Sequence, residues 1–207
     1  MFPETLQTGT ATRPPPAVPS ETIMRLSVDQ YHDMIRNGIL TEDDPVELLD
    51  GWLVSKMARN PPHRVVNGLL QDKLATLVGP NWHINTQEAV TLDISEPEPD
   101  VSVVRGNRLD YRERNPAASE IGMLVEISDT SLTRDRGFKK RIYAQANVPI
   151  YWIVNLVDCV VEVYAHPSGP GEQPDYAQRQ DYRPGDSIPV VLNGREVGRL
   201  AVQEFLV

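Results

Sequence analysis

The sequence predicts a mixed α/β domain in which helices pack over a central sheet. Apolar residues recur at helical spacing in the segment 61–79, and short apolar runs of strand length follow at 100–104 and 122–128. A second helical segment then precedes further apolar runs, so the order is helix, strands, helix, strands. Elements in this order commonly form a sheet flanked by helices.

Length and composition favour one domain behind a tail. The chain has 207 residues, 40% of them hydrophobic, which suffices for a single sizeable core. Residues 1–22 are rich in Pro and Thr and lack apolar periodicity, so we expect a flexible tail there. The domain is expected to occupy residues 23–207.

Cap and turn residues delimit the first elements. Ser27 is a candidate N-cap with Gln30 three residues later, which predicts a short helix ending near Gly38. Asp50 and Gly51 form a tight-turn dipeptide between two apolar arms, which predicts a β-hairpin.

The rest of the chain reads as short strands around one more helix. We expect strands at 83–94, 100–104 and 122–128, a helix at about 134–146, strands at 150–155 and 159–166, and a small C-terminal β unit with turns at 184–185 and 193–194.

Charge and composition limit the function classes. A net charge of −9 and a pI of 4.9 weigh against broad electrostatic attraction to nucleic acid, but not against a nuclease whose carboxylates hold a metal. The sequence has no apolar run of about 18 residues and no secretory signal pattern, so we expect a cytoplasmic protein. The single cysteine, Cys159, is expected to pack as a small apolar residue.

Two carboxylates fall at informative places in the apolar runs. Asp100 heads the run 100–104, and Glu126 lies inside the run 122–128, where a carboxylate is costly unless it is paired or binds a metal. If these two strands are neighbours, the carboxylates converge at one edge of the sheet. Such a pair suits Mg²⁺ or Mn²⁺, and a nearby lysine could stabilise developing negative charge.

These residues carry a family resemblance. Pro99-Asp100 followed by Glu126 resembles the PD-(D/E)xK nuclease superfamily, although Ser128 stands where the usual lysine would be. The chain closely resembles one branch in which the lysine has moved to the next helix, the Uma-type putative restriction endonucleases. The matching motifs, in order, are ELLDG at 47–51, the histidine at 63, PDVSVV at 99–104, LVEIS at 124–128 and DRGFKKRIYAQANVPIYWIVN at 135–155.

The resemblance implies a restriction-endonuclease-like core and metal-dependent cleavage of DNA phosphodiesters. Asp100 and Glu126 would hold Mg²⁺ or Mn²⁺, with the carbonyl of Ile127 as a further candidate ligand. Lys139 would be the catalytic lysine, and its immediate rival is Lys140. Nucleases of this kind often dimerise to cut two strands, so a homodimer is one expected assembly.

Further candidates each have a structural alternative. Glu47 would be an accessory carboxylate, or it only braces the following hairpin. His63 would be an active-site neighbour, or its effect is local to the helix start. Asp135 and Lys139 are four residues apart, so a plain ion pair on a helix surface is the alternative to catalysis.

Two residues depart from the family pattern, and two further acidic residues have a simple structural interpretation. Asn147 replaces the usual glycine after the helix, but asparagine tolerates the left-handed cap conformation. Asn155 stands where the family often has aspartate. Glu96 and Glu98 are expected to be solvated turn residues.

Other function classes remain open from the sequence. A non-catalytic nuclease-fold protein that acts as a binding or self-association module would fit the acidic balance. RNA or a small phosphodiester would fit the same catalytic residues as DNA.

Overall fold

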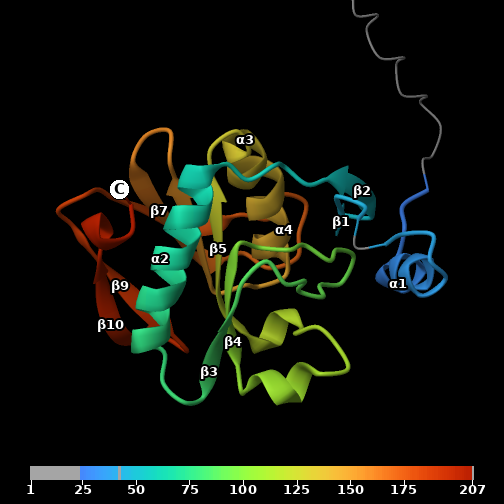
Figure 1. Ribbon diagram of the computed structural model, residues 1–207, viewed down its shortest axis with the longest axis horizontal. Helices are drawn as coiled ribbons and strands as arrows, with labels where there is room; N and C mark the ends of the chain where they lie inside the picture. Colours follow the sequence, from blue (N-terminus) through green and yellow to red (C-terminus); the bar gives the residue numbers. More distant parts are fainter. Residues whose placement is uncertain (1–23, 42, 207) are drawn as a thin grey trace, which may run out of the picture.

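The computed structural model describes residues 24–41 and 43–206 (Figure 1). The predicted tail, 1–22, lies outside the described residues. The helices and strands are α1 (Val28–Arg36), β1 (Val46–Leu49), β2 (Trp52–Ser55), α2 (Pro61–Leu77), β3 (Trp82–Asn85), β4 (Val101–Arg105), β5 (Ile121–Ser128), α3 (Leu132–Arg134), η3 (Asp135–Lys139), α4 (Lys140–Gln145), β6 (Ile150–Asn155), β7 (Val160–Pro167), β8 (Tyr176–Tyr182), β9 (Ser187–Leu192) and β10 (Arg195–Ala201). Short 3₁₀ turns are η1 (Arg108–Tyr111), η2 (Ala118–Glu120) and η4 (Val202–Glu204).

A six-stranded mixed sheet is the centre of the fold. Its strand order is β3-β4-β5-β6-β7-β8, and β5 and β6 are parallel while the other neighbours are antiparallel. The helical segment α3-η3-α4 forms the crossover between the two parallel strands, as such a connection requires. The predicted mixed α/β class is confirmed.

Two apolar cores lie on opposite faces of this sheet. One contains the inward face of α2, the β9–β10 hairpin and the alternating residues Met123, Val125 and Ile127 of β5. The other contains α4 and Leu124 from the opposite face of β5. Figure 1 shows α2 in front of the sheet and α4 behind it. Since side chains alternate along a strand, Glu126 and Ser128 project toward the α4 side with Leu124.

The N-terminal elements follow their local signals. Ser27 caps α1 with a reciprocal capping box to Gln30. Asp50 and Gly51 both have positive φ, 51° and 78°, as the tight turn between β1 and β2 requires. The α1 helix and this hairpin lie together at one side of the molecule (Figure 1). Asn147, with a φ of 58°, adopts the left-handed conformation expected after α4.

Two predictions about local structure are wrong. The strand expected at 83–94 is only the four-residue β3, and a loop with an isolated bridge at Thr91 follows it. The loop is held by its own backbone hydrogen bonds, such as Leu92 N–H to Ser95 O, rather than by a ladder. Cys159 is exposed, because it occupies the turn before β7 with a φ of 50°.

Among the described residues, no helix is both long and apolar enough to cross a membrane.

Candidate active site

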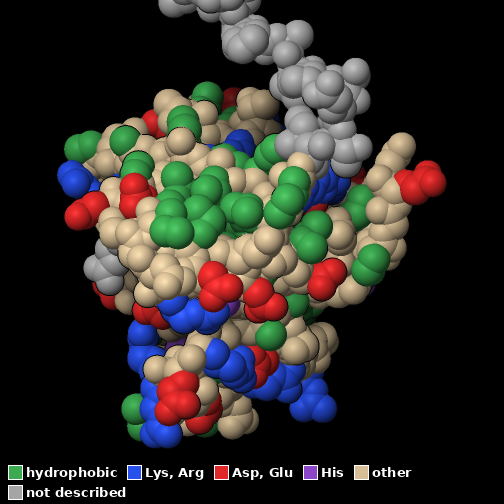
Figure 2. All heavy atoms as spheres, turned by 90° about the vertical axis from the view of Figure 1, so that its right-hand side faces the viewer, with side chains coloured by type: hydrophobic (Ala, Val, Ile, Leu, Met, Phe, Trp, Pro, Cys, Tyr) green, Lys and Arg blue, Asp and Glu red, His purple; other side chains and the backbone are tan. Residues whose placement is uncertain are grey.

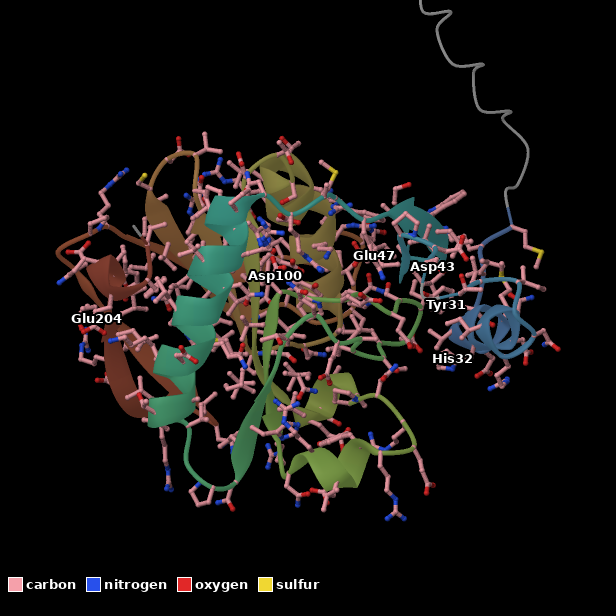
Figure 3. All side chains as sticks on the ribbon, in the orientation of Figure 1. Tyr31, His32, Asp43, Glu47, Asp100 and Glu204 are labelled. Carbon is pink, nitrogen blue, oxygen red and sulfur yellow. The ribbon has the colours of Figure 1, made fainter. Side chains whose placement is uncertain are left out.

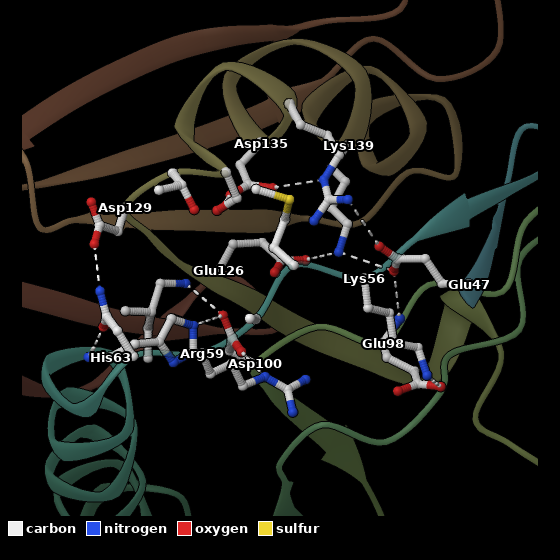
Figure 4. Close-up of a pocket in the computed structure, with 17 residues that line it drawn as sticks. Glu47, Lys56, Arg59, His63, Glu98, Asp100, Glu126, Asp129, Asp135 and Lys139 are labelled. Carbon is white, nitrogen blue, oxygen red and sulfur yellow. Dashed lines mark hydrogen bonds and ion pairs between the residues drawn. The ribbon is translucent and has the colours of Figure 1, made fainter. Parts of the chain in front are cut away.

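Asp100 and Glu126 meet where β4 enters the sheet beside β5. The register pairs Val101 with Val125, which places Asp100 next to Glu126 on neighbouring strands. Both residues are only 5% exposed. Figure 3 shows Asp100 between α2 and Glu47 of the hairpin, and Figure 4 shows the cluster from close by. The convergence expected from the sequence is therefore present.

Three groups surround the Asp100 carboxylate. The backbone N–H of Ile127 donates to Oδ2 at 2.8 Å, and His63 Nε2 lies 3.0 Å from the same oxygen. Arg59 approaches Oδ1 at 3.6 Å. His63 reaches this position because Asn60 caps α2 and accepts from the His63 N–H, which directs the first turn of the helix into the site.

The Glu126 carboxylate is held from the opposite side by helix residues. Its Oε1 accepts from Lys139 Nζ at 3.0 Å and from the Tyr143 hydroxyl at 2.7 Å. Lys139 Nζ also lies 3.1 Å from Glu47 Oε2, so one ammonium joins two carboxylates from distant parts of the chain. Glu47 in turn accepts from the backbone N–H of Glu98 at 3.2 Å.

A π-helical turn presents the lysine. The segment η3 widens the helix over Asp135–Lys139, and both end residues of this segment are buried. The Asp135 carboxylate accepts from the hydroxyls of Ser128 and Ser131 at 2.7 and 2.6 Å. The alternative of a helix-surface ion pair between Asp135 and Lys139 is therefore wrong, since neither residue is on the surface. π-Turns are frequent at functional sites.

The buried part of the site contains more carboxylates than cations. Burial, with Asp135, Asp100 and Glu47 nearby, raises the pKa of Glu126 to about 8 even though Lys139 opposes the shift. Burial alone would lower the pKa of Lys139, but the surrounding carboxylates outweigh it and the pKa is raised. The lysine is therefore a firmly held cation, while the carboxylate opposite it is under-compensated.

A small cavity opens beside these groups. Its volume is about 50 Å³, enough for an ion or a few waters. Three cations that were not predicted as site residues from the sequence also line it: Lys56, Arg59 and Arg134. Arg134 Nη1 donates to Ser55 O at 2.9 Å and lies 3.9 Å from Glu47 Oε1. The only sequence signal for these residues was their basic character, with Lys56 and Arg59 in the loop before α2 and Arg134 at the end of α3.

The structure shows where the rival lysine and the two acidic residues predicted to be solvated lie. Lys140 pairs with Asp175 at 2.8 Å and does not line the cavity, so of these two neighbouring lysines only Lys139 lies there. The prediction of a solvated Glu96 is wrong: this residue is 4% exposed and bonds His32. Glu98 is also not free in solvent, since it pairs with Lys56 at 2.7 Å.

The departures at Ser128 and Asn155 have structural uses. Ser128 is fully buried and its hydroxyl holds Asp135, so the place of the usual lysine now supports the helix that supplies one. Asn155 is also fully buried and donates to Asp158 and Glu162 at 2.9 and 3.1 Å.

Comparisons with known proteins give the family and a shared fold. The model of the Uma2 family, described as a putative restriction endonuclease, matches residues 28–203. The chain belongs to this family. A solved structure with the same fold is a putative nuclease belonging to DUF820 from Anabaena variabilis ATCC 29413, with a TM-score of 0.64 and 16% sequence identity over 87% of this chain and 97% of that chain. A comparison with curated proteins found no match.

Proposed function

We propose that this Uma2-family chain is a metal-dependent endonuclease that hydrolyses DNA phosphodiester bonds. The observation that supports it most is the meeting of Asp100 and Glu126 on neighbouring strands with Lys139 Nζ 3.0 Å from Glu126. A buried cluster of this composition is costly to stability and is retained at sites that do chemistry.

The donor set fits a hard divalent cation. Carboxylate oxygens are the ligands that Mg²⁺ and Mn²⁺ prefer, and no cysteine is near the cluster. No three His, Cys, Asp or Glu side chains of residues 24–41 and 43–206 form a preformed cage. Two carboxylates with waters completing the shell match the usual way that Mg²⁺ is held. We assign Asp100, Glu126 and the Ile127 carbonyl as its ligands.

The electrostatics support the same assignment. Six carboxylates line the cavity, and four of them, those of Glu47, Asp100, Glu126 and Asp135, are buried beside Lys139, which is the one buried ammonium of the lining. The raised pKa of Glu126 reflects this imbalance, which burial and its acidic neighbours create. A bound divalent cation would polarise a phosphoryl oxygen and lower the pKa of a bound water.

The remaining residues have separate roles in the proposal. Lys139 stabilises the negative charge that develops on the phosphoryl group and positions the attacking water. Glu47 keeps Lys139 in place through its 3.1 Å contact. His63 and the Ile127 N–H hold the Asp100 carboxylate in one orientation. Tyr143 does the same for Glu126.

Cleavage of plasmid and of circular single-stranded DNA, with Mg²⁺ or Mn²⁺ and with EDTA, tests the proposal. We expect cleavage by the native chain, none in EDTA, and a loss of about a hundredfold or more for Asp100→Ala and for Lys139→Ala. Lys140→Ala is the matched control, because this neighbouring lysine pairs with Asp175 outside the cavity, and it should keep its activity. Equal cleavage by all variants would indicate a contaminant and overturn the proposal.

A non-catalytic binding module on the same scaffold is the second candidate. The net charge of −9 favours it, since it is a poor match for DNA. Calorimetric titration with Mn²⁺ separates the two candidates. Binding that Asp100→Ala removes favours the nuclease, and no binding together with no cleavage favours the module.

A homodimer and a cytoplasmic location stay predictions. Light scattering on the purified chain tests the first. A dimer would allow two sites to act on two strands of a duplex.

A further inference from the structure

A wide groove continues outward from the catalytic cavity. It has a volume of about 900 Å³, in the range of sites that hold sizeable ligands. Cavity and groove share the loop after β2, including Lys56 and Arg59. The α2 helix forms the other wall, with Arg64, Gly68 and Gln71 at the spacing that places residues on one helix face.

The groove lining carries three cations, three amides and three carboxylates, and the carboxylates are those of Asp43, Asp44 and Glu98. Lys56 and Arg59 stand nearest the catalytic carboxylates, and Arg64 lies farther out on α2. Arg64 is exposed and has no ion-pair partner among the residues that the structure describes. The amide side chains that line the groove are Asn67, Gln71 and Gln87. Cations suit phosphates, and amides suit the edges of unpaired bases.

The other arginine-rich face is less suited to nucleic acid. Over η1 and η2, on the lower part of the face in Figure 2, basic and acidic side chains alternate. Here Arg112 pairs with Glu113 and Arg114 with Glu120, at 3.3 and 2.7 Å. Their charges are largely cancelled locally, as is the charge of Lys56 in the groove, whereas Arg64 faces the groove without such a pair among the described residues.

The depth of the site favours a single-stranded nucleic acid over a duplex. Asp100 and Glu126 are each 5% exposed at the end of a narrow cavity, so a phosphate must be inserted to reach them. Duplex DNA is stiff, with a persistence length of about 50 nm, and carries one charge per about 1.7 Å. A single strand carries half that charge density, bends readily and exposes its base edges. It therefore suits a chain of net charge −9 better.

We propose that the groove formed by the loop 56–60 and α2 binds a single-stranded nucleic-acid segment and leads its phosphate into the cavity. This inference rests on the proposed function and specifies its substrate. Lys56 is paired with Glu98 at 2.7 Å, which leaves Arg59 and Arg64 to contact about two phosphates and predicts a slope of about −1.4 for the logarithm of affinity against the logarithm of salt concentration. DNA and RNA share this chemistry, so both are tested.

Fluorescence anisotropy in EDTA measures binding without cleavage. The probes are labelled strands of roughly 12 nucleotides, as DNA, as RNA and as the matching DNA duplex. Two variants change the groove: Arg64→Glu reverses its outer charge, and Gly68→Leu adds bulk where a Cβ would meet no protein atom within 4 Å. Lys73→Glu is the matched control, since it makes the same charge change on the same helix outside the groove lining.

We expect a single strand, DNA or RNA, to bind about tenfold more tightly than the duplex. Arg64→Glu and Gly68→Leu should weaken it about tenfold, Lys73→Glu less than twofold, and Arg64→Glu should lower the salt slope by roughly 0.7. Tighter or equal binding of the duplex, no binding of any probe, or equal effects of Arg64→Glu and Lys73→Glu would overturn the inference. The binding assay contains EDTA, so its result does not depend on catalysis. If the chain binds a single strand in that assay but does not cleave DNA with Mg²⁺, only the nuclease proposal is contradicted.

Discussion

Two buried glutamates on the same face of the sheet have opposite electrostatic surroundings. The register aligns Glu126 of β5 with Ile153 of β6, and Ile153 with Glu162 of β7, so both carboxylates project to one side. Glu162 is fully buried, and it accepts hydrogen bonds from Arg136, Tyr164 and Asn155. These bonds outweigh the effect of burial and lower the pKa of Glu162.

Glu126 lacks this compensation. Its oxygen Oε1 takes both the Lys139 and the Tyr143 bond, and three other carboxylates lie near it. Burial and these neighbours raise the pKa of Glu126 to about 8. A carboxylate that only stabilises the fold is satisfied by the protein, as at Glu162. One that is left under-compensated fits a partner from outside the chain, which is the physical basis for assigning the site.

Replacing Glu126 by Gln should have the largest effect on activity. We expect the cleavage rate to fall by about a hundredfold or more while the melting temperature stays the same or rises, because a neutral amide relieves the carboxylate cluster. Initial rates with Mg²⁺ and thermal unfolding in EDTA check the two parts. Activity within tenfold of the native chain would contradict the metal-ligand role.

Replacing Glu162 by Ala should mainly cost stability. Two partly exposed arginines and a tyrosine lose their shared acceptor, and we expect a loss of about 2 kcal/mol in the free energy of unfolding, measured in urea. Asp181→Ala is the control at the facing position of β8; its surface pair with Arg179 should be worth less than about 1 kcal/mol. Equal losses would mean that burial does not distinguish the two carboxylates.

The pH dependence of stability should carry opposite signs for the two residues. The folded metal-free chain keeps a proton on Glu126 between its ordinary pKa of 4.5 and about 8, so this contribution to stability falls as the pH rises through that window. The contribution of Glu162, whose pKa is lowered, is present above its ordinary pKa and is lost as the pH falls.

Thermal unfolding in EDTA from pH 3 to 9 measures this smallest effect, since the Glu126 contribution changes above pH 4.5 and the Glu162 contribution below it. Glu126→Gln should flatten the decline above pH 5 and leave the acid side unchanged. An unaltered decline in that variant would show that other groups cause it.

Much of the fold was predictable because its signals are local. The capping box at Ser27, the Asp50-Gly51 turn and the apolar spacing of α2 each act within a few residues, and all three elements form. The prediction of a strand at 83–94 was wrong because it also relied on a local pattern alone. Its partial alternation resembles a strand, but after β3 its backbone bonds go to the residues that follow it, 95–100, and to the loop at Pro116 and Ala117.

The candidate site, like the fold, was predictable from the sequence only in part. The sequence by itself determined that Asp100 stands at the entry of one strand and Glu126 lies inside another, because strand periodicity and the cost of a buried charge act on each segment alone. Only the tertiary structure decided that Lys139 rather than Lys140 enters the cavity, because the π-turn at η3 sets which side of the helix faces the sheet. It also decided that Arg59 contacts Asp100 and that Glu96 is buried, since these contacts join residues that are far apart in the chain.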